Sequence, residues 1–361
     1  MPVLDIIGMS QVSTQQLTLN ANQFNQKLEG CDLVSTTSFT YAYYYLREGD
    51  WLKLLTYGGA SGNYTKRLGV GHRVGVFGID QSKKYYGGFR YKKVSGIDSR
   101  FSAVLGIYDS GLGTTATLLV LLADNEIAGY VAGAEYYVEY ALDYVNAIIT
   151  IWVDGVKIKD VAFPTWITDI LASDVTRLAV SYGSPTSVSV GYSIMGTMYI
   201  KDIYFKRADS VDEEFRLGPQ SIVSLNLATV DAPNWVSSDE SLTALQVLGT
   251  PITDVNSTLA PTTTSPTTKT PLQAGFTVPE GKGTINAISM AIAASRLSGT
   301  SAGLSTTLVE DGSQSNPKTT VLGSAISTGI SAGTFAKTPK NNPLTPESVA
   351  ELRLKVTPIN A

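Results

Sequence analysis

Apolar and polar residues alternate through most of residues 35–206, and the 3.6-residue spacing of helices is nearly absent there. Residues 135–143 show the pattern well. One side of that run is apolar or aromatic and consists of Tyr136, Val138, Tyr140 and Leu142. Because successive side chains of a strand point to opposite faces, this alternation predicts a strand that buries one side.

The clearest local signal is a hairpin. A β-branched run at 146–153 is followed by Asp154-Gly155 and by a second β-rich run at 156–161. Asp-Gly suits the positive φ angles of a two-residue hairpin turn, so the two runs are expected to pair. Similar short runs recur between Gly and Asn turns and predict a β-sandwich. Further strands are expected at 39–46, 73–79, 89–93, 102–108, 115–123 and 197–206, and a short helix at 165–171.

The alternation weakens after residue 206, which indicates a change of organisation. Residues 207–271 are typical of an extended connector, and their last part, 256–271, is a Thr/Pro-rich linker. A second β-rich unit follows, with strands expected at 284–297, 305–310, 320–330 and 353–357. The chain is therefore predicted to be all-β, with an N-terminal domain over 1–206, a connector and linker over 207–271, and a small C-terminal domain over 272–361.

One short helix in the C-terminal unit has clear end signals. Thr345 is the expected N-cap, and Pro346 is the expected first helical residue. Ser348 stands at the position where a capping box usually has Glu or Gln. The sequence thus predicts a helix that begins after Thr345.

Composition narrows the possible functions. Charged residues make up only 16 % and hydrophobic residues 43 %, so the chain is not of the disordered class. The net charge of −4 gives no indication of nucleic-acid binding. No apolar run approaches the roughly 20 residues that cross a bilayer, so no membrane contact is expected, and the N-terminus does not resemble a signal peptide. With a single Cys and a single His, no metal site and no cofactor site is expected.

Catalytic motifs are weak. Gly-x-Ser-x-Gly occurs at 299–303, around Ser301, and at 329–333, around Ser331, but a nucleophile elbow needs a strand–turn–helix and a later histidine. The only histidine, His72, precedes both and lies in a Gly-rich run at 69–75 that we interpret as a turn. Nothing in the sequence places Cys31 beside His72. We therefore expect no catalytic residue and no enzymatic activity.

Carboxylates do not form an obvious catalytic pair either. Glu135, Glu139 and Asp143 share one face of a strand, but neighbours four residues apart lie roughly 13 Å from each other. Glycoside hydrolysis needs two carboxyl groups within roughly 10 Å. Asp212, Glu213 and Glu214 follow in the connector. We interpret these acidic residues as solvated charges.

Clustered tyrosines are the most suggestive feature of the sequence. Aromatic faces stack on sugar rings, and tyrosine is enriched where proteins meet. Alternating tyrosines on a strand can equally belong to the core, so core, protein interface and glycan platform all remain open. The candidate contact or glycan-stacking residues are Tyr41, Tyr43, Tyr45, Tyr85 and Tyr86.

Two stretches resemble a known family. Residues 136–161, with the Val-Asp-Gly hairpin, and the strand at 197–207 look like the later strands of a concanavalin-A-like (laminin-G-like) jelly roll. The motif Arg216-Leu217-Gly218-Pro219 and the region around Trp235 resemble a connector in virion structural proteins of tailed bacteriophages. The stretches at 285–296 and 342–349 resemble the small C-terminal β-domain of those proteins, although the Gly and Trp that usually precede its short helix are lacking.

This resemblance implies a non-enzymatic component of a bacteriophage virion, such as a head decoration, a collar or head fibre, or a tail component. Its implied partners are other virion proteins and copies of itself, and its implied location is the virion, assembled in the host cytoplasm. The alternative is a carbohydrate-binding adhesin that attaches to host-surface glycans. No calcium or sugar site is carried over, because no calcium-loop spacing is present.

Overall fold

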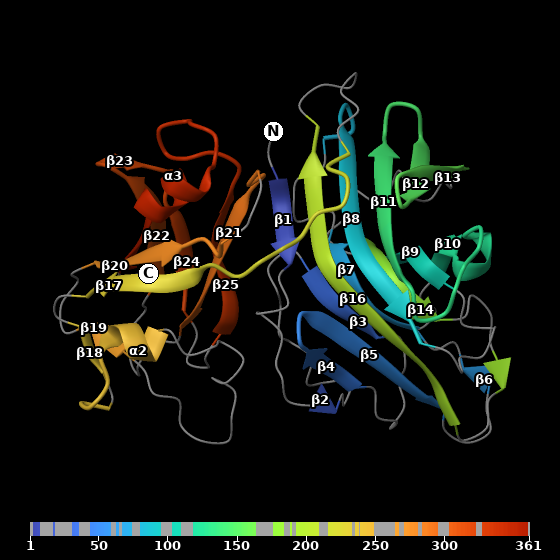
Figure 1. The fold of residues 1–361 in the computed structure, drawn as a ribbon, viewed down its shortest axis with the longest axis horizontal. Helices are drawn as coiled ribbons and strands as arrows, with labels where there is room; N and C mark the ends of the chain where they lie inside the picture. The colour runs from blue at the N-terminus through green and yellow to red at the C-terminus, as the bar shows by residue number, and fades with distance from the viewer. Residues whose placement is uncertain are drawn as a thin grey trace. The chain divides into compact units, whose positions relative to one another are not determined.

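The structure is a computed structural model that divides into two compact units, residues 1–222 and 223–361 (Figure 1). It describes residues 3–7, 17–18, 31–35, 44–58, 63–64, 67–73, 80–94, 103–109, 118–163, 176–183, 188–189, 193–208, 216–232, 235–237, 239–248, 264–266, 271–280, 284–294, 303–322 and 327–359.

Unit 1 is built on a large antiparallel sheet. Its strands lie in the order β13 (Val156–Ala162), β12 (Ile148–Val153), β11 (Glu135–Asp143), β8 (Lys84–Lys93), β16 (Ser193–Arg207), β5 (Trp51–Gly58), β4 (Tyr44–Glu48) and β2 (Leu17–Thr18). The long strand β16 pairs with β8 on one side. On its other side it pairs first with β5 and then with β1 (Val3–Ile7).

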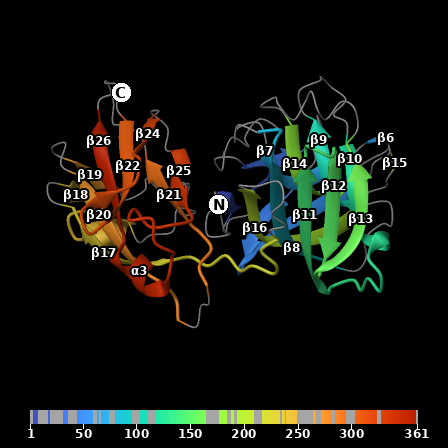
Figure 2. The same ribbon diagram turned by 90° about the horizontal axis from the view of Figure 1, so that it is seen from above.

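A second antiparallel sheet forms the other layer of unit 1 (Figure 2). Its order is β10 (Leu118–Ala123), β9 (Ala103–Asp109), β14 (Thr176–Gly183), β7 (Arg67–Arg73) and β3 (Cys31–Ser35). The short strands β15 (Val188–Ser189) and β6 (Asn63–Tyr64) pair separately, and a 3₁₀ turn, η3 (Asp124–Glu126), follows β10. Two facing antiparallel sheets confirm the predicted jelly-roll sandwich.

The strand predicted at 135–143 is confirmed as β11, but the expectation that it buries only one side is wrong, because both of its faces are buried. Its inner face carries Tyr136, Val138, Tyr140 and Leu142, and none of them is more than 9 % exposed. The neighbouring strand β8 contributes Tyr85, Phe89 and Tyr91 to the same core. Tyr91 stacks on Tyr136 with ring centroids 5.6 Å apart. The core of the sandwich is thus rich in aromatic rings, which bury large areas of apolar surface.

The predicted hairpin is also confirmed. Asp154 and Gly155 join β12 to β13 with φ angles of 48° and 82°, the two positive values of a type I′ turn. The turn is attached to β11, because the Tyr137 N–H donates to Asp154 Oδ1 (2.8 Å) and the Asp154 N–H donates to the Tyr137 carbonyl (2.8 Å). The hairpin therefore extends the large sheet by two strands.

Unit 2 has a sheet of its own. Its order is β17 (Asn226–Asp231), β20 (Leu272–Thr277), β26 (Arg353–Ile359), β22 (Gly303–Glu310) and β23 (Ser313–Gln314), and β24 (Lys318–Val321) also pairs with β22. The other pairs are β18 (Trp235–Ser237) with β19 (Thr264–Pro266), and β21 (Ile288–Ala294) with β25 (Ser327–Phe335). The helices are α2 (Ala244–Leu248) and α3 (Pro346–Glu351).

Helix α3 begins as predicted. The Thr345 hydroxyl accepts from the Ser348 N–H (3.1 Å), and the Ser348 hydroxyl accepts from the Thr345 N–H (2.9 Å). A serine thus completes the capping box that the sequence suggested would prefer Glu. The buried Val349 joins the helix to the core of unit 2.

Two features of the chain differ from the sequence-based expectation. The predicted connector over 207–271 is divided, because its residues 216–222 belong to unit 1 and β17 pairs with β20 inside unit 2. The Gly-rich run at 69–73, interpreted as a turn, is part of strand β7. The glycines of this run pair through their backbone with β3 and β14, as other strand residues do. The helix expected at 165–171 lies outside the described residues.

The boundary between the units can be tested with two fragments. We expect residues 1–222 to unfold cooperatively, because they contain both sheets of unit 1. A cut within 256–271 would instead separate β17 from β20 and leave an unpaired strand on the N-terminal piece. Fragment 1–255 should therefore associate more than fragment 1–222 in sedimentation velocity, with equal near-ultraviolet dichroism. A monomeric 1–255 fragment would contradict this assignment of β17.

Gly87 tests the packing of the aromatic core. A Cβ atom at Gly87 would overlap the ring of Tyr140, which is buried against the same face of β8. Overpacking a core costs about 1–3 kcal/mol, so Gly87→Ala should lower the free energy of unfolding by that amount in urea melts. Gly129→Ala measures backbone strain alone, since that position has open space but a positive φ of 69° that an alanine side chain disfavours. A Gly87→Ala variant as stable as the wild type would contradict this packing.

Candidate functional site

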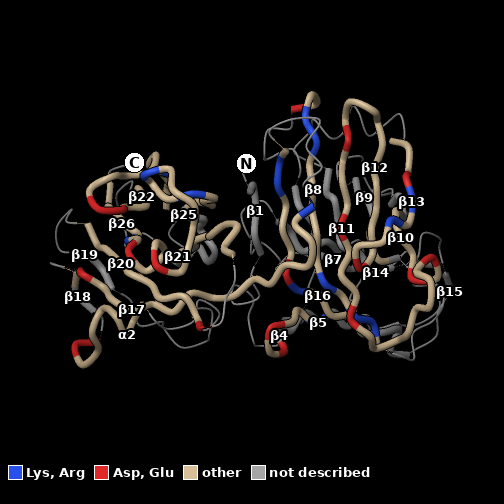
Figure 3. Tube along the Cα trace, turned by 45° about the horizontal axis from the view of Figure 1, so that its top comes forward, with Lys and Arg blue, Asp and Glu red and all other residues tan. Residues whose placement is uncertain are grey.

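The outer face of the large sheet gathers polar and aromatic side chains from four strands. Cross-strand register places Lys53 of β5 opposite Tyr199 of β16, Tyr199 opposite Lys92 of β8, and Lys92 opposite Glu135 of β11. Residues directly opposite one another share a face and lie within contact distance. A continuous row of side chains therefore crosses the sheet, and basic residues gather along β8 and β16 (Figure 3).

Two aromatic rings form the centre of this region. Trp51 and Tyr199 make an edge-to-face pair with ring centroids 6.4 Å apart. Lys92 Nζ lies 4.6 Å from the Trp51 ring centroid and 4.7 Å from that of Tyr199. Lys201 Nζ lies 4.2 Å from the Trp51 ring, and Lys53 Nζ lies 5.6 Å from the Tyr199 ring. We call these five residues the aromatic–lysine patch.

Carboxylates bind two of the three lysines. Lys53 Nζ donates to Glu48 Oε2 (2.8 Å), and the Tyr199 hydroxyl lies 3.4 Å from the same oxygen. The hydrogen bond from Lys53 lowers the pKa of Glu48, and the bond to Glu48 raises the pKa of Lys53. Lys201 Nζ is 3.9 Å from Glu135, at the limit of an ion pair. Within the described part of the chain, Lys92 has cation–π contacts but no carboxylate within 4.0 Å.

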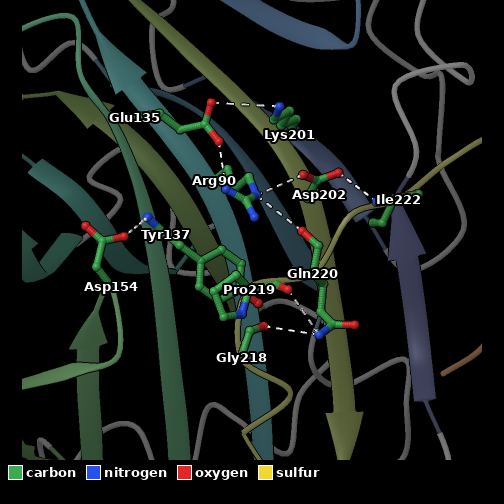
Figure 4. Close-up of polar contacts among 10 residues, drawn as sticks. All are labelled: Arg90, Glu135, Tyr137, Asp154, Lys201, Asp202, Gly218, Pro219, Gln220 and Ile222. Atoms are coloured by element: carbon green, nitrogen blue, oxygen red, sulfur yellow. Dashed lines mark hydrogen bonds and ion pairs between the residues drawn. The ribbon is translucent and has the colours of Figure 1, made fainter. Parts of the chain in front are cut away.

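A short segment of chain, residues 216–222, lies over the neighbouring part of the same face, and we call it the strap. The Arg90 guanidinium donates through Nε to the Gln220 carbonyl (3.2 Å), and the same nitrogen lies 3.2 Å from Asp202 Oδ2 (Figure 4). Arg90 Nη1 donates to Glu135 Oε1 (2.7 Å). Asp202 Oδ1 accepts from the Ile222 N–H (2.8 Å). Side chains of the sheet thus hold the strap by its backbone.

Asp202 can reach the strap because β16 has a bulge there. The register between β16 and β8 shifts between Lys201 and Tyr204, and Asp202 has a φ of 56°. Aspartate tolerates this left-handed conformation better than most residues do. Burial raises the pKa of Asp202, although the Ile222 N–H and the cations Lys201 and Arg90 oppose that rise.

Glu139 is the second anchor of the strap. Its Oε1 accepts from the Gly218 N–H (3.0 Å) and from the Tyr204 hydroxyl (3.0 Å). Arg216 Nη1 lies 3.7 Å from Oε2, and the guanidinium covers the ring of Trp152 at 4.8 Å. The carboxylate is 2 % exposed, and this burial raises its pKa. Glu139 is therefore an internal polar anchor.

The strap determines which aromatic rings of this face are accessible. Tyr137, Tyr204 and Trp152 are exposed by only 2 %, 3 % and 7 %. Trp51 and Tyr199 face the same way on the sheet but remain partly exposed. Among the described residues, the aromatic–lysine patch is thus the part of this face whose rings a ligand can reach.

Tyr85 and Tyr86, which the sequence suggested as contact or stacking residues, do not belong to the patch. Tyr85 and Tyr86 are 0 % and 2 % exposed, so neither offers a contact or stacking surface. Tyr85 points into the core and stacks on Phe205 with centroids 5.7 Å apart. Tyr86 belongs to a buried cluster on the opposite face with Ala141 and Trp152. Burial on both faces of β8 corrects the expectation for this pair.

The remaining candidates on this list are only partly described. The backbone of Tyr45 lies in β4 opposite Leu54, while Tyr41 and Tyr43 lie outside the described residues. Asp212, Glu213 and Glu214 also lie outside them. The interpretation of the strand carboxylates as solvated is wrong for Glu139 and for Asp143, which is 9 % exposed. Hydrogen bonds from Asn146 and an ion pair with Lys84 (3.1 Å) hold Asp143.

The structure describes only part of the catalytic motifs considered from the sequence. Ser331 lies within strand β25 opposite Ala291, so the strand–turn–helix of a nucleophile elbow is missing there. Ser301 lies outside the described residues. Cys31 and His72 are direct partners in the pairing of β3 with β7, a juxtaposition that the sequence did not indicate.

Sequence reasoning missed the aromatic–lysine patch. Tyr199 and Lys201 alternate on a strand that was predicted, and this period of two was the available signal. Trp51, Lys53 and Lys92 come from distant strands. Their proximity depends on the register of β5, β16 and β8, which local patterns do not determine.

Searches for known proteins found similarity at the level of structure. No family model and no curated protein matches the chain. Solved structures that match include a sialidase, at 16 % identity and a TM-score of 0.31, over 59 % of this chain and 20 % of that one. An alginate lyase from Pseudomonas aeruginosa matches at 10 % identity and a TM-score of 0.31, over 47 % of this chain and 88 % of that one. Lectin I-B4 from Griffonia simplicifolia matches at 9 % identity and a TM-score of 0.31, over 56 % and 99 %.

The fold is an all-β jelly roll, and the comparisons correct one expectation about enzymatic activity. The chain was expected not to be an enzyme, but its structural neighbours include several alginate lyases and a sialidase, which are enzymes. The absence of activity therefore does not follow from the fold. Among the residues that the structure describes, no helix is long and apolar enough to span a membrane. No group of three or more His, Cys, Asp or Glu in that part of the chain could hold a metal ion.

The buried anchor Glu139 predicts a specific pH dependence. Because burial raises its pKa, the folded state holds the proton more tightly than the unfolded state does, and ionisation at higher pH costs stability. The stability of the wild type relative to Glu139→Gln should therefore fall as the pH rises from the ordinary pKa of a glutamate through the raised pKa of Glu139. Urea melts at several pH values measure this difference.

Asp143→Asn is the matched control with the opposite sign. Burial raises the pKa of Asp143, but hydrogen bonds from Asn146 and the ion pair with Lys84 outweigh it, so the net pKa is lowered. The wild type should be more stable than Asp143→Asn at neutral pH. This difference in stability should disappear as the pH falls through the lowered pKa. Two variants with the same pH trend would contradict these assignments.

Proposed function

We propose that this protein binds carbohydrate on the outer face of its large sheet, through the aromatic–lysine patch. The observation that carries the proposal is the pair of partly exposed rings, Trp51 and Tyr199, with Lys92 Nζ within 4.7 Å of both centroids. Aromatic rings present flat apolar faces to the C–H groups of a sugar ring. Lysine ammonium groups supply hydrogen-bond donors for its oxygens.

The neighbouring residues and strands that hold the patch in position also favour a binding role. A binding site needs side chains whose positions are held by their neighbours. Glu48 holds Lys53 and Tyr199, and the strands that carry Trp51, Lys92 and Tyr199 are adjacent in one sheet. Strand scaffolds position side chains more rigidly than loops do, so less conformational entropy is lost when a ligand binds.

We further propose, from the sequence resemblance to tailed-bacteriophage structural proteins, that the chain acts within a virion as an adhesin. Its partners would then be copies of itself, other virion proteins and host-surface glycans, with assembly in the host cytoplasm. Mass spectrometry of purified particles tests this setting. Recovery of the chain only outside particles would contradict it and would leave the binding proposal intact.

Trp51 tests the binding proposal directly. On a glycan array, or in titrations with the polysaccharide that the array identifies, Trp51→Ala should bind about tenfold more weakly than the wild type. An aromatic contact contributes about 0.5–1.5 kcal/mol, and about 1.4 kcal/mol corresponds to tenfold. Tyr199→Ala should have a similar effect, because its ring is the other half of the pair.

The control is Val156→Ala, a 66 % exposed position on the edge strand β13. It should bind like the wild type, and thermal melts should show that all variants remain folded. Equal binding by Trp51→Ala and Val156→Ala would exclude the patch as the carbohydrate site. Release of reducing ends in the same samples shows whether the bound chain is also cleaved.

A further inference from the structure

The charges around the patch are unevenly matched. Among the residues that the structure describes, four cations lie on this part of the sheet, from Lys53, Lys92, Lys201 and Arg90, against three carboxylates, from Glu48, Glu135 and Asp202. Glu48 pairs with Lys53 at 2.8 Å. Glu135 and Asp202 pair with Arg90 at 2.7 and 3.2 Å.

Lys92 forms no direct ion pair with any of these three carboxylates, although its charge contributes to the lowered pKa of Glu48. Its ammonium group lies between the two rings of the patch, and in the described part of the chain no carboxylate stands within 4.0 Å of it. Lys201 is bound only loosely, at 3.9 Å from a carboxylate whose other oxygen already accepts from Arg90 at 2.7 Å. The patch thus presents positive charge directly beside its stacking surface.

We propose that the ligand of the patch is an anionic sugar chain, whose carboxylate or sulfate group binds Lys92 while a ring of the same chain stacks on Trp51 or Tyr199. This inference rests on the proposed function and specifies its substrate class. A hydrogen bond between an ammonium group and an anionic oxygen is stronger than one to a neutral hydroxyl. An ammonium group that rings partly shield from water gains more from an anion than a fully hydrated one does.

The position of Lys92 explains why it should discriminate. The residue directly opposite it on β16 is Tyr199, so charge and ring belong to one row of the sheet. Its opposite neighbour on β11, Glu135, is the carboxylate that Arg90 holds. Lys201 is the other cation over the Trp51 ring, so both ammonium groups lie beside the same stacking surface.

The test uses the full chain and pairs of polymers with the same sugar backbone, one charged and one neutral. Sodium polygalacturonate and its methyl ester share their sugar rings, as do dextran sulfate and dextran. We expect one anionic polymer to bind on the order of tenfold more tightly than its neutral counterpart in calorimetric titrations, and this preference to shrink in high salt. The two pairs distinguish a carboxylate from a sulfate.

Lys92→Gln locates the preference. It keeps most of the side-chain length and removes the charge, so it should bring the anionic polymer down to the affinity of the neutral one. Lys157→Gln is the matched control, because Lys157 is a 54 % exposed lysine on β13 paired with Asp160 (2.7 Å). It should leave the preference unchanged, and melting curves confirm that both variants fold.

The outcomes separate this inference from the proposed function. Equal affinity for charged and neutral polymers, with binding still lost in Trp51→Ala, would overturn the anionic class and keep the carbohydrate site. An anionic preference that Lys157→Gln and Lys92→Gln reduce equally would overturn the role of Lys92 and indicate a diffuse charge effect. Binding of none of the four polymers, nor of any glycan on the array, would overturn both.

Discussion

The pairing of β16 with β8 is the constraint on which the rest of unit 1 depends. These two long strands form the middle of the large sheet, and their register decides which of their side chains face the core and which face outward. Inward residues such as Phe205 and Tyr85 build the aromatic core. Outward residues such as Tyr199 and Lys92 meet in the patch. A shift by one residue would exchange the two sets, and burial of the aromatic core prevents such a shift.

The bulge at Asp202 divides the outer face into two parts with different roles. On one side of it the strap covers Tyr137 and Tyr204, and on the other side the rings of Trp51 and Tyr199 remain partly exposed. Covering the first part requires the burial of Glu139 and Asp202, whose pKa values rise as a result. Backbone N–H groups of the strap compensate for that burial, because they donate to both carboxylates.

The tyrosines show why residue type alone does not identify a binding surface. Tyr85, Tyr86 and Tyr199 all lie on the central strands of one sheet, yet the first two are buried and the third is partly exposed. Tyr85 faces the second sheet, and Tyr86 is covered together with Trp152. What distinguishes Tyr199 is the absence of the strap above it and the presence of Trp51 beside it.

The sequence by itself determined the features that depend on near neighbours in the chain. These are the extended backbone of β11, the Asp154-Gly155 turn and the capped start of α3 at Thr345, because each depends on backbone geometry within a few residues. Only the tertiary structure decided which of the outward side chains are covered. The patch joins Trp51 to residues 41 and 148 positions later, and the strap reaches back to Arg90 across 130 residues. Such proximity arises from strand register and from burial on two faces of one sheet, and neither is encoded in a local pattern.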